Sequence, residues 1–153
     1  MTERILVPLD GSKVGEAALE IVKNVITKYA SDVKVEVTLL QVLTSLSHYV
    51  VAGETSVQVL YTADELSQIK KAASDYLQKV AEPLARLGAQ INVKVATGNA
   101  ADEILKAAEE INASFIGMST HGRSGISRWA LGSVTERVLR ASGRPILVVR
   151  ASK

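Results

Sequence analysis

The sequence predicts an α/β fold, an open five-stranded parallel sheet with helices on both faces. Short runs of apolar and β-branched residues alternate along the chain with segments of helical periodicity. Each helical segment is long enough to connect two parallel strands, which favours a doubly wound sheet. A chain of 153 residues is expected to form a single domain, residues 1–153, because neither half would supply a proper core.

Composition restricts the class of protein. Hydrophobic residues make up 47% of the chain and aromatic residues only 4%, so the core must consist mainly of Val, Ile, Leu and Ala. The charged fraction of 22% and the net charge of +2 are not those of a disordered protein. The absence of Cys excludes disulfides, thiolate metal sites and cysteine nucleophiles. Two scattered histidines do not favour a metal site.

The first part of the chain predicts two strands separated by a helix, and then a long loop. Residues 5–7 form a β-branched and Leu run closed by Pro8, which suits a strand buried on both faces. Helical spacing of apolar residues follows from residue 17, and residues 33–42 return to strand character. Residues 43–62 are polar, and their apolar residues follow no clear helix or strand spacing. They predict a long loop, and loops of this length are often functional.

The second half continues the alternation. A helix is expected from about residue 63 to 87, with Gly88 ending it and Pro83 predicting a kink or an early end near Glu82. The remaining expected elements are a strand at 91–95, a helix from about 100, a strand at 114–118, a Gly- and Ser-rich loop with a short helical tail at 119–131, a helix at 133–141 and a last strand at 146–149.

Ligands of such sheets bind beyond the carboxyl ends of the strands, where the winding reverses. The strongest candidate there is residues 119–125, followed by Gly132 and Ser133 at a helix start. Small residues let the backbone approach a ligand, and free helix N–H groups attract anions. Hydroxyls of Ser133 and Thr135 and the charge of Arg123 would add to a phosphate site. A tight turn with a capped helix explains the same residues equally well, and neither a Walker A loop nor the dinucleotide fingerprint is present.

Two other features leave alternatives open. Asp10 follows the first strand and could accept hydrogen bonds from ribose hydroxyls, or it could only cap the first helix. From Ser119 onward there are seven basic residues against one acid, Glu136, which suits a polyphosphate, a nucleic acid or simply a solvated helix face. Only Trp129 could stack on bases in this stretch, so a nucleotide is favoured over a long polymer. No Gly-x-Ser-x-Gly elbow is present, and catalysis has weak support.

Several segments together resemble the universal stress protein family. They are Ile5–Ser12, Leu39–Val42, Met118–Gly122, Gly132–Glu136 and Pro145–Val149. The resemblance spans nearly the whole chain and implies a Rossmann-like nucleotide-binding fold with strand order 3-2-1-4-5. Family members divide into those that bind ATP and those that do not.

The ATP-binding pattern of that family is Gly-x2-Gly-x9-Gly-Ser/Thr. Gly122, Gly132 and Ser133 match it, whereas Ser119 replaces the first glycine, a change expected to weaken binding without abolishing it. The resemblance implies a site for ATP or AMP, with Mg²⁺ as an option. Residues facing adenine and ribose would be Pro8, Leu9, Asp10 and Val42. Those holding ribose and phosphates would be Met118, Ser119, Gly122, Arg123, Gly132, Ser133, Val134 and Thr135.

The function expected from these features is that of a cytoplasmic stress-response regulator that binds a nucleotide rather than turning it over. The alternatives are a protein-interaction module of the same fold without nucleotide, and a slow ATPase; nucleic-acid binding is the least favoured. The first residues lack the pattern of a signal peptide. Residues 37–53 are interrupted too often by polar side chains to span a membrane, so a soluble protein is expected.

The last strand predicts assembly. Residues Ile146, Leu147, Val148 and Val149 form an apolar run at an expected sheet edge, flanked by Arg144 and Arg150. Such an edge invites pairing with a second copy, and antiparallel self-pairing about a two-fold axis closes after two chains. The family resemblance implies the same homodimer.

Overall fold

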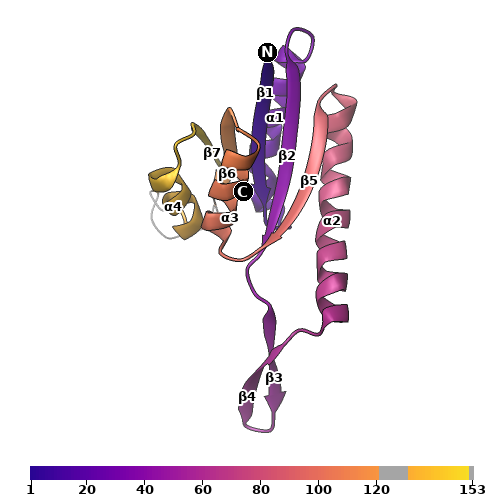
Figure 1. The fold of residues 1–153 in the computed structure, drawn as a ribbon, viewed down its shortest axis with the longest axis vertical. Coiled ribbons are helices and arrows are strands. Elements are labelled where there is room, and N and C mark those ends of the chain that lie inside the picture. The colour runs from indigo at the N-terminus through magenta and orange to yellow at the C-terminus, as the bar shows by residue number, and fades with distance from the viewer. Residues whose placement is uncertain (121–130, 152–153) are drawn as a thin grey trace.

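The computed structural model describes residues 1–120 and 131–151 and places five parallel strands in one sheet (Figure 1). The elements are β1 (Thr2–Leu9), the 3₁₀ turn η1 (Val14–Glu16), α1 (Ala17–Tyr29), β2 (Lys34–Leu43), β3 (Ser47–Ala52), β4 (Thr55–Leu60), α2 (Ala63–Arg86), β5 (Gln90–Thr97), α3 (Ala100–Glu110), β6 (Phe115–Thr120), α4 (Ser133–Ala141) and β7 (Ile146–Arg150).

The predicted sheet is confirmed. Its strand order is β5-β2-β1-β6-β7, which corresponds to 3-2-1-4-5 when the two short strands β3 and β4 are left out of the numbering. Each neighbouring pair in this sheet is parallel. Right-handed crossovers explain the order: two successive connections place β2 and β5 on one side of β1, and α3 then carries the chain back to β6.

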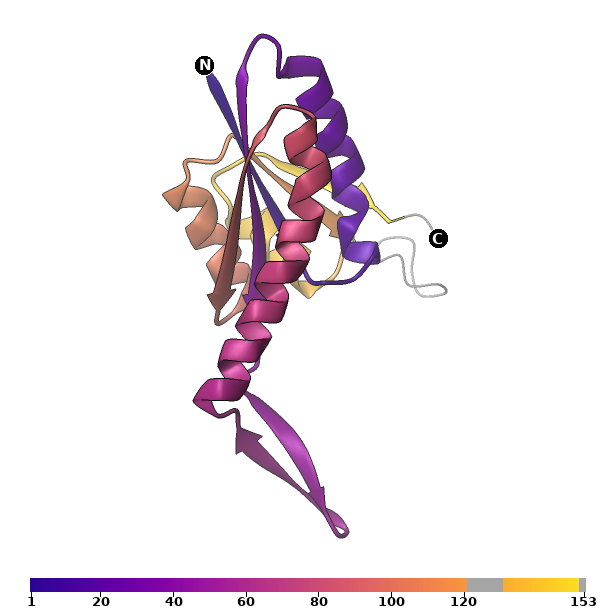
Figure 2. The same ribbon diagram turned by 90° about the vertical axis from the view of Figure 1, so that its right-hand side faces the viewer.

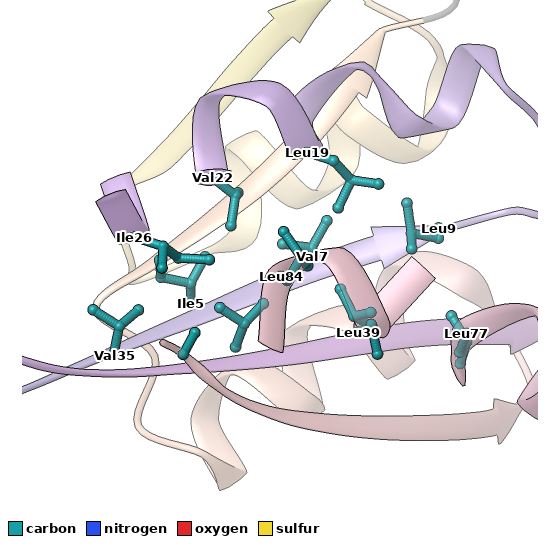
Figure 3. Close-up of a cluster of buried hydrophobic side chains, with 13 residues drawn as sticks. Ile5, Val7, Leu9, Leu19, Val22, Ile26, Val35, Leu39, Leu77 and Leu84 are labelled. Carbon is teal, nitrogen blue, oxygen red and sulfur yellow. The ribbon is translucent and has the colours of Figure 1, made fainter. Parts of the chain in front are cut away.

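Helices cover both faces of the sheet. Alternate residues of β1 point to opposite faces, so Ile5 and Val7 pack under α1 and α2, whereas Leu6 packs under α3 and α4. Burial on both faces is why the centre of β1 is a continuous apolar run. Figure 3 shows the first cluster, in which α1 contributes Leu19, Val22 and Ile26, and α2 contributes Leu77 and Leu84.

The prediction of a loop over residues 43–62 is wrong. Most of this segment is an antiparallel hairpin of β3 and β4, joined by Gly53 and Glu54 and extending away from the sheet (Figures 1 and 2). Gly53 has φ +67°, the left-handed conformation that tight hairpin turns require. The sequence does not show the alternation of apolar and polar residues that marks a strand, because both faces of the hairpin are exposed and carry valines. Strand alternation is visible in a sequence only where one face is buried.

The early end expected near Glu82 is also wrong, because α2 continues past Pro83 to Arg86. Proline removes one hydrogen bond here, but buried Ala81 and Leu84 hold this last part of the helix on the sheet. The start of α2 is a capping box in which Thr62 Oγ1 accepts from the Glu65 N–H and Glu65 Oε2 accepts from the Thr62 N–H. Within residues 1–120 and 131–151, none of the helices is long and apolar enough to cross a membrane.

Candidate functional site

The carboxyl ends of β1 and β6 lie side by side at the centre of the sheet. The chain leaves β1 toward β2 and β5 and returns across the sheet to β6, so the winding reverses between these two strands. In open α/β sheets this crevice is where ligands bind. The same edge also carries the end of β2, from which the hairpin projects (Figure 1).

Six of the twelve sequence-predicted site residues lie at this edge, near or just after the ends of β1, β2 and β6. Pro8 and Leu9 end β1, and Leu9 pairs with Gln41, the neighbour of Val42 near the end of β2. Met118 and Ser119 belong to β6, next to β1. The remaining described residues, Gly132, Ser133, Val134 and Thr135, form the start of α4. Gly122 and Arg123 lie outside the described residues, as does Trp129.

The loop after β1 holds Asp10 in place. Its Oδ1 accepts from the Ser12 N–H at 2.9 Å and from the Ser12 hydroxyl at 2.6 Å, and Ser12 Oγ accepts from the Gly15 N–H at 3.0 Å. A Cβ on Gly15 would lie 2.4 Å from Asp10 Oδ1, so any other residue at position 15 would force the carboxylate to move. Ser12 therefore bonds to the turn before α1, and the N-cap of α1, Glu16, makes no side-chain capping hydrogen bond.

The start of α4 is arranged differently from the starts of α2 and α3. Thr62 and Asn99 cap those helices with their side chains, whereas the N-cap of α4 is Gly132, which has none. Gly132 has φ +82°, a conformation that favours glycine, and it is exposed together with Ser133 and Val134. A helix start without a capping side chain leaves its first N–H groups available to solvent or to an anion.

Both basic residues of α4, and Arg144 beyond its end, are paired with acids. Arg137 donates to Asp102 at 2.6 Å and Arg140 to Glu136 at 2.7 Å. Arg144 donates to Glu109 at 3.0 Å, a hydrogen bond that lowers the pKa of the Glu109 carboxyl. These pairs neutralise much of the charge that the sequence displays after residue 131, which favours the interpretation as a solvated helix face.

Ser119 has a role that the sequence did not reveal. It belongs to β6, which extends through Thr120 because Ser119 and Thr120 pair with Val149 and Arg150 of β7, so these two residues are strand and not the expected loop. Ser119 Oγ accepts from the Ala18 N–H at 2.8 Å and donates to the Gly15 carbonyl at 2.8 Å. The hydroxyl thus ties the end of β6 to the start of α1.

The Ser119→Ala variant is expected to lose about 1–3 kcal/mol of free energy of unfolding, because the part-buried Ala18 N–H and Gly15 carbonyl lose their partner. Urea denaturation measures this loss. Ser67→Ala, at an exposed position of α2, is the matched control and is expected to change stability by less than about 0.5 kcal/mol. An equal effect of the two substitutions would contradict the assigned role.

Sequence reasoning also missed two polar groups beside the Asp10 loop. Gln41 Oε1 and the Tyr76 hydroxyl are buried and have no hydrogen-bond partner among residues 1–120 and 131–151. Burial raises the pKa of Tyr76 to about 12, and the charges of Glu16 and Asp10 add to the shift, so the hydroxyl remains a donor at physiological pH. Tyr76 lies in a helix far along the chain, and no sequence signal connects it to Asp10. Among the described residues no cluster of His, Asp or Glu could hold a metal ion.

The model of the Universal stress protein family matches residues 1–150. The chain belongs to the universal stress protein family. Universal stress protein MJ0531 of Methanocaldococcus jannaschii is 32% identical over 151 residues, which cover 99% of this chain and 84% of that protein. Universal stress protein YxiE of Bacillus subtilis is 30% identical over 155 residues, which cover 98% and 100% of the two chains.

Solved structures of this family share the fold. MJ0577 of M. jannaschii superposes with a TM-score of 0.70 at 24% identity, covering 99% of this chain and 97% of that one. A family member from Arabidopsis thaliana with AMP bound has a TM-score of 0.65 at 12% identity, over 98% and 92% of the chains. A universal stress protein in complex with cAMP has a TM-score of 0.60 at 21% identity, over 98% of both chains.

Proposed function

We propose that this universal stress protein binds an adenine nucleotide, ATP or AMP, and that Mg²⁺ accompanies the triphosphate. The observation that carries the proposal is the start of α4, where Gly132 leaves the helix without a capping side chain. The Arg137–Asp102 hydrogen bond holds this part of α4 beside the first turn of α3, which follows the carboxyl end of β5, so we expect the helix start to face the same crevice as Asp10. Phosphates fit this helix start, and the carboxylate of Asp10 fits ribose hydroxyls. The AMP and cAMP complexes of structurally similar proteins support the same ligand class.

The residues proposed to face adenine and ribose are Pro8, Leu9, Asp10 and Val42. Those proposed for ribose and phosphates are Met118, Ser119, Gly122, Arg123, Gly132, Ser133, Val134 and Thr135. Because the Ser119 hydroxyl is bonded to Gly15 and Ala18, Ser119 would contribute its backbone to the ligand rather than its side chain. Its replacement of a glycine is therefore compatible with binding.

The proposed role is that of a cytoplasmic stress-response regulator that acts by binding, with at most weak hydrolysis of ATP. The sequence has no Walker lysine and no nucleophile elbow, so it offers no evident group for rapid phosphoryl transfer. Calorimetric titration with ATP and Mg²⁺ tests the binding, with AMP as a second titrant. The absence of both heat and a thermal shift at millimolar nucleotide would reject it.

A glycine substitution localises the site. Gly132→Ala is expected to weaken nucleotide binding about tenfold or more, because a side chain at φ +82° is strained by about 1–2 kcal/mol and displaces the N–H groups of Ser133 and Val134. Gly53→Ala is the matched control: its φ is +67°, a Cβ would meet nothing within 4 Å at either glycine, and it lies in the hairpin turn. Equal loss of affinity in the two variants would place the ligand elsewhere.

A homodimer through Ile146–Val149 is the proposed assembly. β7 is an edge of the five-stranded sheet, and the side chains of these four residues are only half-buried within one chain. An apolar edge without interior Pro or Gly is a template for a further strand. Pairing of β7 with its copy about a two-fold axis would extend the sheet across both chains.

A further inference from the structure

The β3–β4 hairpin is an exposed apolar element that the proposed nucleotide site does not use. It extends away from the sheet beyond the end of β2 (Figures 1 and 2). Tyr49, Val51 and Leu60 are 71%, 77% and 75% exposed, and Leu46, Val50, Val57 and Val59 are exposed as well. Glu54, in the turn, is the only charged residue from 43 to 62.

A hairpin of this kind needs additional strands. A two-stranded hairpin is marginally stable in water by itself, and three or more strands or packing on a helix are needed for stability. β3 and β4 form a two-stranded sheet, so in the part of the chain that the structure describes neither outer edge has a neighbouring strand. Proteins usually protect such edges with charged residues, proline or bulges. Neither β3 nor β4 contains a charge or a proline.

The outer edge of β4 is the more accessible one. All six residues from Thr55 to Leu60 are exposed, whereas β3 begins with two half-buried residues, Ser47 and His48. The His48 ring also stacks on Tyr61, with centroids 4.6 Å apart. β4 therefore offers an uninterrupted, uncharged edge over its full length.

The pattern of hydrogen bonds within the hairpin shows which backbone N–H and C=O groups lie on the outer edge of β4. The Tyr61 N–H donates to the Leu46 carbonyl at 3.0 Å, and hydrogen-bonded pairs recur at every second residue of an antiparallel ladder. The backbone groups of Val57 and Val59 consequently face β3. Those of Ser56, Gln58 and Leu60 face outward, which places Gln58 at the middle of the free edge.

We propose that β4 pairs antiparallel with β4 of a second copy of this chain and forms a four-stranded intermolecular sheet. About a two-fold axis, Gln58 then opposes Gln58 of the partner subunit, and Ser56 opposes Leu60 of the partner subunit. An uncharged strand meets its own copy without like-charge repulsion, and in a two-fold contact both chains contribute the same edge. The hairpin has no Lys or Arg that would attract an anionic membrane or a nucleic acid.

This contact is distinct from the one proposed for β7. A pair of six-residue strands buries much less than the roughly 800 Å² per partner that standard stable interfaces have, so it is weak as an isolated contact. A disulfide formed across a weak contact makes that contact detectable. The chain has no cysteine of its own that would interfere with such cross-linking. In the proposed register the Cα atoms of the two Gln58 residues lie about 5.5 Å apart, a separation that a disulfide spans.

The experiment compares three single-cysteine variants of the full chain under mild oxidation, analysed by non-reducing gel electrophoresis. Gln58→Cys is expected to form a disulfide-linked dimer at least tenfold faster than Gln68→Cys, a control at an exposed position of α2. Tyr49→Cys, on the outer edge of β3, tests the other edge. A further variant, Gln58→Lys, places like charges opposite each other in the proposed contact. It is expected to have a lower average molecular mass in solution than the unmodified protein at high protein concentration.

Each outcome decides the proposal. Rapid cross-linking of Gln58→Cys with a retained thermal transition supports it. Cross-linking of Gln58→Cys at the rate of Gln68→Cys would overturn it, as would faster cross-linking of Tyr49→Cys, which would assign the contact to β3. Nucleotide titration of the same variants is expected to match the unmodified protein, which separates the hairpin contact from the nucleotide site.

Discussion

The Val148→Pro variant is expected to be a monomer under conditions in which the unmodified protein is a dimer. The register of β7 explains why this position is decisive. The Ile116 N–H donates to the Pro145 carbonyl at 2.9 Å, and the Ala151 N–H donates to the Thr120 carbonyl at 3.4 Å. In a parallel ladder with this phase, the backbone of Leu147 and Val149 faces β6, whereas that of Val148 faces the free edge.

Proline at 148 therefore removes an outward N–H and leaves the ladder to β6 intact. Edge strands tolerate proline when the missing N–H faces solvent, so the fold of each chain is expected to survive. A two-fold dimer loses two hydrogen-bond donors through this substitution, because each chain contributes one Val148 N–H near the axis. The substitution thus acts on the proposed interface and spares the sheet inside each chain.

Light scattering at tens of micromolar protein measures the result, in a Gln58→Lys background that excludes the hairpin contact. Val148→Ala is the matched control and is expected to remain dimeric, because alanine keeps the N–H. A monomeric mass for the Gln58→Lys protein without a β7 substitution would refute the β7 dimer. A dimeric mass for the proline variant would show that another surface holds the chains together.

Leu77→Ala is expected to cause the largest loss of stability among the substitutions considered. Leu77 is fully buried, and it is one of four buried residues along the 24-residue length of α2, with Tyr76 and Val80 partly buried against the same core. Replacing such a leucine removes its transfer free energy and leaves a cavity, which together cost about 2–5 kcal/mol. That is a large part of the roughly 5–15 kcal/mol by which domains of this size are stable.

Urea denaturation followed by circular dichroism tests the prediction. Leu87→Ala is the matched control: Leu87 ends the same helix but is 39% exposed, and its loss is expected to cost less than about 1 kcal/mol. Similar midpoints for Leu77→Ala and the unmodified protein would mean that α2 does not depend on this contact. A weaker dependence of the unfolding free energy on urea concentration for Leu77→Ala would indicate that α2 detaches before the sheet unfolds.

The family resemblance implied the strand order, whereas the residues by themselves predicted the strands, the helices and a parallel sheet. The reason is local: a strand buried on both faces must be apolar throughout, as residues 5–7 are, and a helix packed on one face repeats its apolar residues every three or four positions. Helix starts are local as well. Ser133 begins α4 as predicted, and Gly132 precedes it with the left-handed φ that its residue type permits.

Only the tertiary structure decided the details of the candidate site and the form of residues 43–62. Ser119 bonds to Gly15 and Ala18, more than 100 residues away, and Tyr76 lies near Asp10 only because α2 packs beside the first loop. The hairpin faces solvent on both sides, so no burial imposed a period on its sequence. Sequence patterns record which residues must be buried, whereas contacts between distant segments, and strands that no core covers, become defined only once the chain has folded.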